Sequence, residues 1–188
     1  TWYFLSLVHH RNNFLLDVGD IYLRLMMVWG FFLPWQARYS LDSLRQSDWK
    51  KLPNQFYSLA TFGYLIQVST AYFMAALLKY DPLWTRTGDA LYCALSIDQF
   101  STDFAKSLLA YPHFLKIFNF LALGIEYTAP FFLLCPWNTR SVRAFGLFLL
   151  LSFHFGILCC LHLGLLVPIC MLVLVGLVPG HIIDWFEA

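Results

Sequence analysis

The sequence is poor in charge, since Asp, Glu, Lys and Arg make up 12% of its 188 residues while hydrophobic residues make up 60%. Soluble domains carry about twice that share of charged residues. A chain this apolar cannot cover its surface with polar groups, so lipid must cover much of it. The composition therefore argues against an ordinary soluble domain and predicts a protein embedded in the lipid bilayer.

Several familiar signals are also absent. The net charge of +1 gives no indication of a nucleic-acid partner. The five cysteines are odd in number and form no C-x-x-C pair, so we interpret them as small apolar residues and expect no disulfide framework and no metal site. No P-loop, Rossmann glycine pattern or G-x-S-x-G motif occurs. The first apolar stretch, residues 1–8, is too short to span a bilayer, and we expect a fragment or a shortened member of its family.

The main feature of the sequence is its long apolar runs. A bilayer-spanning helix needs about 20 mainly apolar residues. Five hydrophobic segments stand out, at residues 21–35, 59–78, 114–135, 144–163 and 165–178, the first and last of them short. We therefore expect an all-α polytopic helix bundle with about five hydrophobic helices, forming a single transmembrane domain over residues 1–188.

The stretch between the second and third segments, residues 79–113, is more polar. Apolar residues recur there at helical spacing from Ala90 to Ile97, and polar residues then interrupt before Phe104. This pattern predicts one or two short amphipathic helices, lying on the membrane surface or in a re-entrant loop.

Basic residues orient the predicted bundle by the positive-inside rule. The loop at residues 36–58 holds four Lys or Arg against two Asp, and the loop at residues 136–143 holds Arg140 and Arg143 without an acid. We expect both loops in the cytoplasm. The loop at residues 79–113, with more acids than bases, is then expected in the periplasm or an organelle lumen.

Charged residues inside spans are costly and mark either a function or a paired contact. Lys79, where the second segment ends, is either a lysine whose amine reaches out to water or an amine held in an apolar pocket as a base. Glu126, in the third segment, is expected to be protonated, to accept from a tyrosine, or to pair with Arg24.

Two histidines, His154 and His162, lie in the fourth segment, about 12 Å apart along a helix, which is too far to share a metal. Each is either a hydrogen-bonded bundle residue or, singly, a ligand for a haem or chlorophyll.

One stretch is more specific: from Gln67 the sequence reads Q-V-S-T-A-Y-F-M-A-A-L-L-K-Y-D-P-L-W. It resembles the membrane domain of vitamin K-dependent gamma-carboxylases and the related HTTM proteins. The residues at matching spacings are Gln67, Tyr72, Phe73, Ala75, Lys79, Asp81 and Trp84. Further similarity lies in R-Y-S-L-D at residues 38–42, in Gly19 and Asp20, in E-Y-T-A-P at residues 126–130 and in S-F-H at residues 152–154.

The resemblance implies that Lys79 is the base that deprotonates a vitamin K-like quinol, on the lumenal side of the membrane. The same resemblance implies that Asp81 and Glu126 are further catalytic residues, and that the quinone is bound by Tyr72, Trp84 and His154. The large lumenal domain of the carboxylases does not follow the last segment in this sequence, so a peptide substrate has no obvious place to bind.

A second reading has no catalysis. A small helical chain with short loops can be an accessory subunit of a larger membrane assembly, such as a photosynthetic or respiratory complex, contributing lipid-facing helices and a histidine ligand to a pigment. Lys79 distinguishes the two readings, because an enzyme requires it and a scaffold would tolerate a replacement.

Overall fold

The computed structural model describes residues 1–11, 17–33 and 58–178, and within these ranges the chain is all-α, as predicted. Its helical elements number nine there. In chain order they are α1 (Trp2–Arg11), α2 (Val18–Trp29), α4 (Leu59–Leu77), η3 (Leu83–Thr87), α5 (Ala90–Leu95), α6 (Asp103–Leu108), α7 (Pro112–Leu134), α8 (Thr139–Cys160) and α9 (Leu166–Val175).

Three of these helices are long and apolar enough to cross a membrane: α4 with 19 residues, α7 with 23 and α8 with 22. They coincide with the three full-length hydrophobic segments of the sequence. The two short segments overlap α2 and α9, whose 12 and 10 residues are too few to span a bilayer as straight helices.

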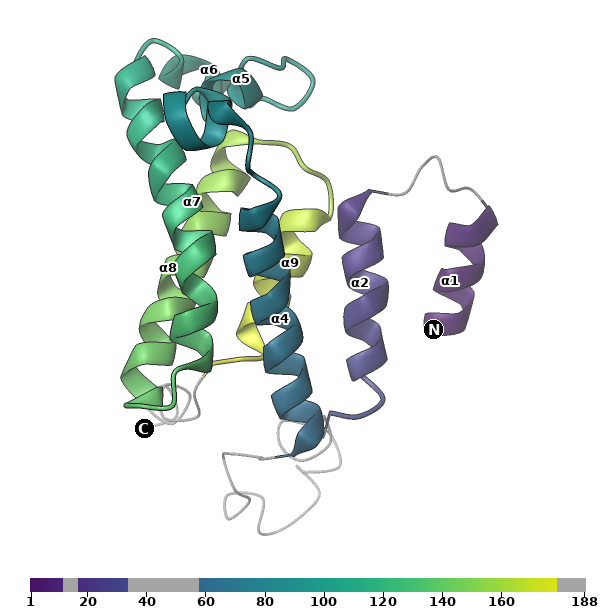
Figure 1. Ribbon diagram of the computed structural model, residues 1–188. Coiled ribbons are helices and arrows are strands. Elements are labelled where there is room, and N and C mark those ends of the chain that lie inside the picture. The colour runs from purple at the N-terminus through teal and green to yellow at the C-terminus, as the bar shows by residue number, and fades with distance from the viewer. Residues whose placement is uncertain (12–16, 34–57, 179–188) are drawn as a thin grey trace, which may run out of the picture.

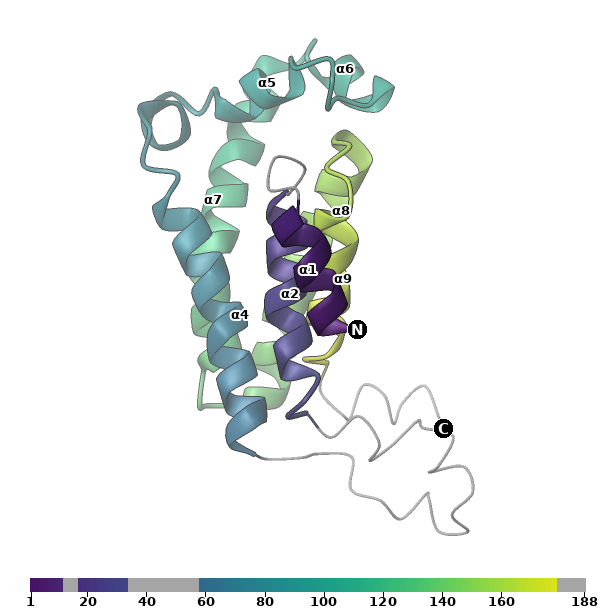
Figure 2. The same ribbon diagram turned by 90° about the vertical axis from the view of Figure 1, so that its right-hand side faces the viewer.

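The long helices run side by side, with α4 packed against α7 and α7 packed against α8 (Figure 1). Helix α9 packs against α8 and α2, and α1 lies outermost against α2. Helices α5 and α6 lie across one end of the bundle, where they contact α7 and α8 respectively (Figure 2).

The core is built from apolar stripes on each helix. On α4 the buried residues Leu65, Val68, Tyr72 and Ala76 recur every three or four positions, so they share one face. They meet buried residues of α7, α8 and α9, among them Ala129, Leu133, Leu147, Leu150, Val173 and Leu174. The outward faces are apolar too: Phe131 is 69% exposed and Leu172 is 71% exposed. Apolar side chains facing both ways suit helices that lie in lipid.

Helices α5 and α6 confirm the predicted short helices between the second and third segments. The side chain of Thr102 caps α6 by accepting from the amide of Ala105, and it also donates to the carbonyl of Cys159 at 2.8 Å. A second small core of Leu95, Ala105 and Leu115 joins this end to α7.

Two prolines mark α7. Pro112 stands at its first turn, where no intrahelical amide donor is needed, and Pro130 lies inside the helix, where one backbone hydrogen bond is therefore missing.

The basic residues from which the orientation of the bundle was predicted lie only partly within the described ranges. Residues 36–57, with the R-Y-S-L-D motif, lie outside them. Arg140 and Arg143 belong to the first turns of α8 and not to a loop, because α8 already begins at Thr139. Helix α5 and the connection from α7 to α8 stand at opposite ends of the bundle (Figure 1). Which end faces the cytoplasm stays a prediction.

Candidate functional site

Lys79 and Glu126 form an ion pair inside the bundle. Lys79 lies just beyond the last turn of α4, and its Nζ donates to Oε2 of Glu126 at 2.5 Å and to the carbonyl of Ala75 at 3.4 Å. The side chains are 23% and 6% exposed. The lysine therefore folds back along its own helix, and its amine joins a buried carboxylate instead of reaching out to water.

Pairing with Arg24 was one of three states that the sequence left open for Glu126, and the structure shows Lys79 as the partner instead. Helix α2, which carries Arg24, packs against α1 and α9, whereas α7, which carries Glu126, packs against α4 and α8. The end of α4 consequently brings Lys79 to the carboxylate. A cation is also favoured at this place by the partial negative charge of the carbonyls that end α4.

Trp84 completes this group. The centre of its ring lies 5.4 Å from Nζ of Lys79, within the range of a cation–π interaction. We call Lys79, Glu126 and Trp84 the amine site. It joins three of the residues that the sequence singled out, from the end of α4, from α7 and from η3.

Asp81 has a different position. It is exposed, its Oδ1 accepts from the amide of Leu83 at 2.8 Å, and its carbonyl accepts from the hydroxyl of Thr85 at 3.2 Å. Asp81 therefore starts the turn into η3, and within the described residues it makes no ion pair with Lys79.

Tyr72 and His154 form a second buried pair, between α4 and α8. The phenol oxygen of Tyr72 lies 2.8 Å from Nε2 of His154, and the residues are 7% and 6% exposed. Nδ1 of His154 and the hydroxyl of Ser69 are buried without a hydrogen-bond partner. The pair therefore leaves one buried ring nitrogen of His154 without a hydrogen bond. By contrast His162, which follows α8, is exposed.

Asn119 is a site residue that the sequence analysis missed. It is fully buried on α7, its Nδ2 donates to the carbonyl of Trp84 at 2.9 Å, and its Oδ1 accepts from the amide of Leu91 at 3.3 Å. The available signal was one amide in an apolar run, seven residues before Glu126 and so on the same face of the helix.

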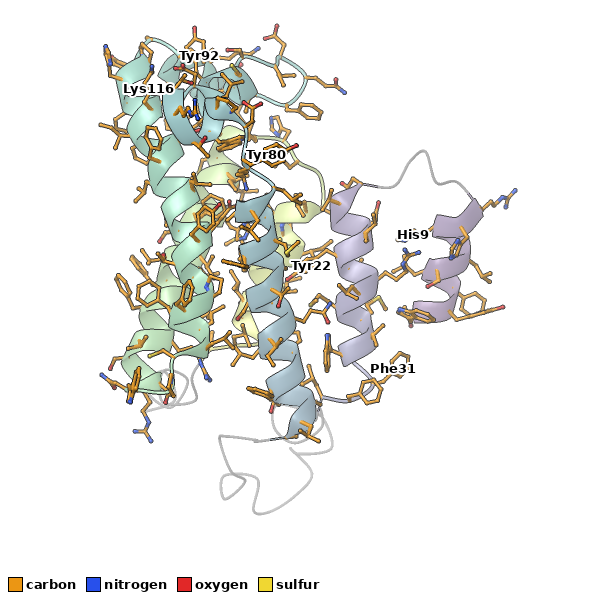
Figure 3. The ribbon with its side chains drawn as sticks, viewed as in Figure 1. His9, Tyr22, Phe31, Tyr80, Tyr92 and Lys116 are labelled. Carbon is orange, nitrogen blue, oxygen red and sulfur yellow. The ribbon has the colours of Figure 1, made fainter. Side chains whose placement is uncertain are left out.

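Two ion pairs lie at the outer end of the bundle. Lys116 lies at the α5 end of α7 (Figure 3), and its Nζ is 3.0 Å from Oδ1 of Asp89. The hydrogen bond from this amine lowers the pKa of the Asp89 carboxyl below its usual value. Asp98 accepts from Lys106 at 2.9 Å and raises the pKa of that amine. All four side chains are more than a third exposed, so these contacts contribute little to stability.

Comparison with family models, curated proteins and solved structures finds no match for this chain. The function therefore has to be argued from the amine site and the Tyr72–His154 pair. No group of three or more His, Cys, Asp or Glu side chains converges in the part of the chain that the structure describes.

Proposed function

We propose that this chain is a membrane-embedded protein of the HTTM and gamma-carboxylase-like type, which binds a lipid-soluble quinol and uses Lys79 as a base. The observation that carries the proposal is the Lys79–Glu126 ion pair beneath the ring of Trp84. A charged pair at the end of an apolar helix bundle is costly to bury, and by default it marks a function.

The residues of the amine site fit a quinol. A quinol has a planar aromatic ring with hydroxyl groups on its edge, so it needs an aromatic face and a proton acceptor next to each other. Trp84 supplies the face, and the nitrogen of Lys79 lies 5.4 Å from its centre. Tyr72 lies about two turns before Lys79 along α4, and its partner His154 keeps one ring nitrogen without a hydrogen bond.

The two charged residues can make the base themselves. Transfer of one proton from Nζ of Lys79 to Oε2 of Glu126 turns the ion pair into a neutral amine and a neutral acid. The transfer removes two opposite charges, whose burial is costly. The amine can then accept a proton from a hydroxyl group beside it, while Glu126 keeps the proton it received. A bound quinol would supply that hydroxyl and become a quinolate anion beside the protonated amine.

The proposed orientation follows from the basic residues. With α4, α7 and α8 crossing the bilayer, Arg140 and Arg143 mark the cytoplasmic end. The amine site then lies toward the periplasm or organelle lumen, next to η3 and α5.

The test is purification in mild detergent, followed by mass spectrometry of bound small molecules and by titration with menadione and its reduced form. We expect a quinone to bind to the chain itself. Lys79→Met should weaken binding roughly tenfold to a hundredfold, as expected for loss of a charge-assisted hydrogen bond of about 1.5–3 kcal/mol.

Lys106→Met is the matched control, because Lys106 is an exposed lysine at the same end of the bundle. Equal quinone binding by the wild type and Lys79→Met would overturn the proposal. Partner subunits or pigments that co-purify in fixed ratio, unchanged by Lys79→Met, would instead indicate an accessory subunit of a larger membrane complex.

A further inference from the structure

One face of α7 holds the chain from Trp84 to Leu91 in place. Asn119 and Phe120 follow Lys116 by three and four positions, so each lies near Lys116 on the helix surface. Lys116 binds Asp89 at 3.0 Å. Phe120 packs against Gly88, where an added Cβ would lie 2.7 Å from the phenylalanine ring.

Asn119 is the innermost of the three contacts. Its exposure is 0%, whereas the side chain of Lys116 is 41% exposed. Both ends of its amide are used, one on each side of the turn: Nδ2 on the carbonyl of Trp84 and Oδ1 on the amide of Leu91. A buried amide with both ends satisfied fixes a single geometry, because a shift of the turn would leave polar atoms without partners.

The same helix also carries the carboxylate of the amine site. Glu126 follows Asn119 by seven residues, about two turns or ~10.5 Å along the axis, on the same face. Helix α7 therefore sets two positions at once: Glu126 holds the amine of Lys79, and Asn119 holds the backbone of the tryptophan whose ring covers that amine.

We propose that Asn119 is a positioning residue, which holds Trp84 over the amine of Lys79 and thereby sets which planar ligand the amine site accepts. The part that concerns the ligand rests on the proposed quinol function. The part that concerns Trp84 depends only on the protein.

The first measurement needs no ligand. The fluorescence of Trp84 is obtained as the spectrum of the full chain minus that of Trp84→Phe, with each further variant made in both backgrounds. We expect Asn119→Leu and Lys79→Met each to change this difference spectrum. Because both remove the same contact between ring and amine, the double variant should change it no more than one of them does.

Lys106→Met is the control, since Lys106 pairs with Asp98 outside this stretch and an exposed ion pair contributes little, so it should leave the Trp84 spectrum near that of the wild type. Asn119→Asp keeps the acceptor for Leu91 and loses the donor to Trp84, so it should shift the spectrum in the same direction even if Asn119→Leu does not fold. A wild-type Trp84 spectrum in the folded Asn119 variants, or effects of Asn119 and Lys79 that simply add, would overturn the proposal.

The second measurement is menadione binding. Trp84→Phe and Asn119→Asp should each raise the Kd several-fold, and their combination should raise it no further. Absence of binding by the wild type would refute the quinol function and leave the Trp84 result standing. Binding that depends on Lys79 but not on Asn119 would refute the positioning role alone.

Discussion

The phenol oxygen of Tyr72 lies 2.8 Å from Nε2 of His154, and this contact ties α4 to α8 in the middle of an apolar core. The other ring nitrogen, Nδ1, is buried without a partner. Tyr72 therefore gives the imidazole its one hydrogen bond within the described residues. Loss of the phenol would leave the imidazole of His154 without a hydrogen bond. An apolar residue in place of His154 would likewise leave the phenol of Tyr72 without one.

This contact predicts that Tyr72→Phe lowers the free energy of unfolding by about 1–3 kcal/mol, because it leaves a buried imidazole unpaired. His154→Leu should lower it by a similar amount, and the double variant should lose less than the sum of the two. Thermal unfolding in detergent, followed by circular dichroism, measures all three. Strictly additive losses would show that the two side chains do not interact.

A second prediction concerns Gly88, which has a φ of +73° and packs against Phe120. Gly88→Ala should destabilise the fold by at least about 1–2 kcal/mol, because a Cβ is strained in this left-handed conformation and would also meet the phenylalanine ring. Gly124→Ala is the control: it lies inside α7 with no atom within 4 Å of an added Cβ. It should stabilise the helix by about 0.5–1 kcal/mol. Equal melting temperatures for the two variants would contradict this account.

A third prediction is the pH dependence of the Asp89–Lys116 contact. The lysine lowers the pKa of the Asp89 carboxyl below its ordinary value of 3.8. The contact therefore stabilises the fold above that ordinary value, and its contribution is lost as the pH falls through the lowered pKa. The difference in melting temperature between the wild type and Asp89→Asn should shrink as the pH falls below 3.8. In a Lys116→Gln background the difference should be small at every pH. A gap that widens on acidification would contradict the assignment.

A fourth prediction tests the orientation with two cysteines. Cys93 is exposed on α5, and Cys135 follows the last residue of α7 at the other end of the bundle. Variants that keep one of these cysteines and lack the rest are treated in sealed vesicles with a maleimide that cannot cross the bilayer. Cys93 should react from the periplasmic or lumenal side and Cys135 from the cytoplasmic side. Reaction of both from one side would contradict a crossing by α7, and reversed sides would contradict the charge-based orientation.

Hydrophobic runs predicted the long helices well, because a helix long and apolar enough to cross a membrane is apolar along most of its length. The segment predicted at residues 59–78 became α4 at Leu59–Leu77. The agreement is poorer for α8, which begins at Thr139 and not at residue 144. Its first turns contain Arg140 and Arg143, and hydropathy detects the lipid-facing part of a helix but not its polar end.

Side-chain partners were harder to predict, since they depend on which helices are neighbours. Lys79 and Glu126 were both recognised as costly charges, yet their pairing needed α4 beside α7. Asn119 was missed because a single amide in an apolar run has no period and no motif. Its role becomes visible only when the backbone of Trp84 lies against it.

Pro130 stands four residues after Glu126, and a proline nitrogen has no hydrogen to give to the carbonyl four residues before it. The backbone carbonyl of Glu126, the residue that binds Lys79, therefore lacks its hydrogen bond within α7. Helices bend most readily at such a point. A bilayer that grows thicker or thinner makes its spanning helices tilt or bend. A bend of α7 at this point would move the carboxylate of Glu126 relative to Lys79 on α4.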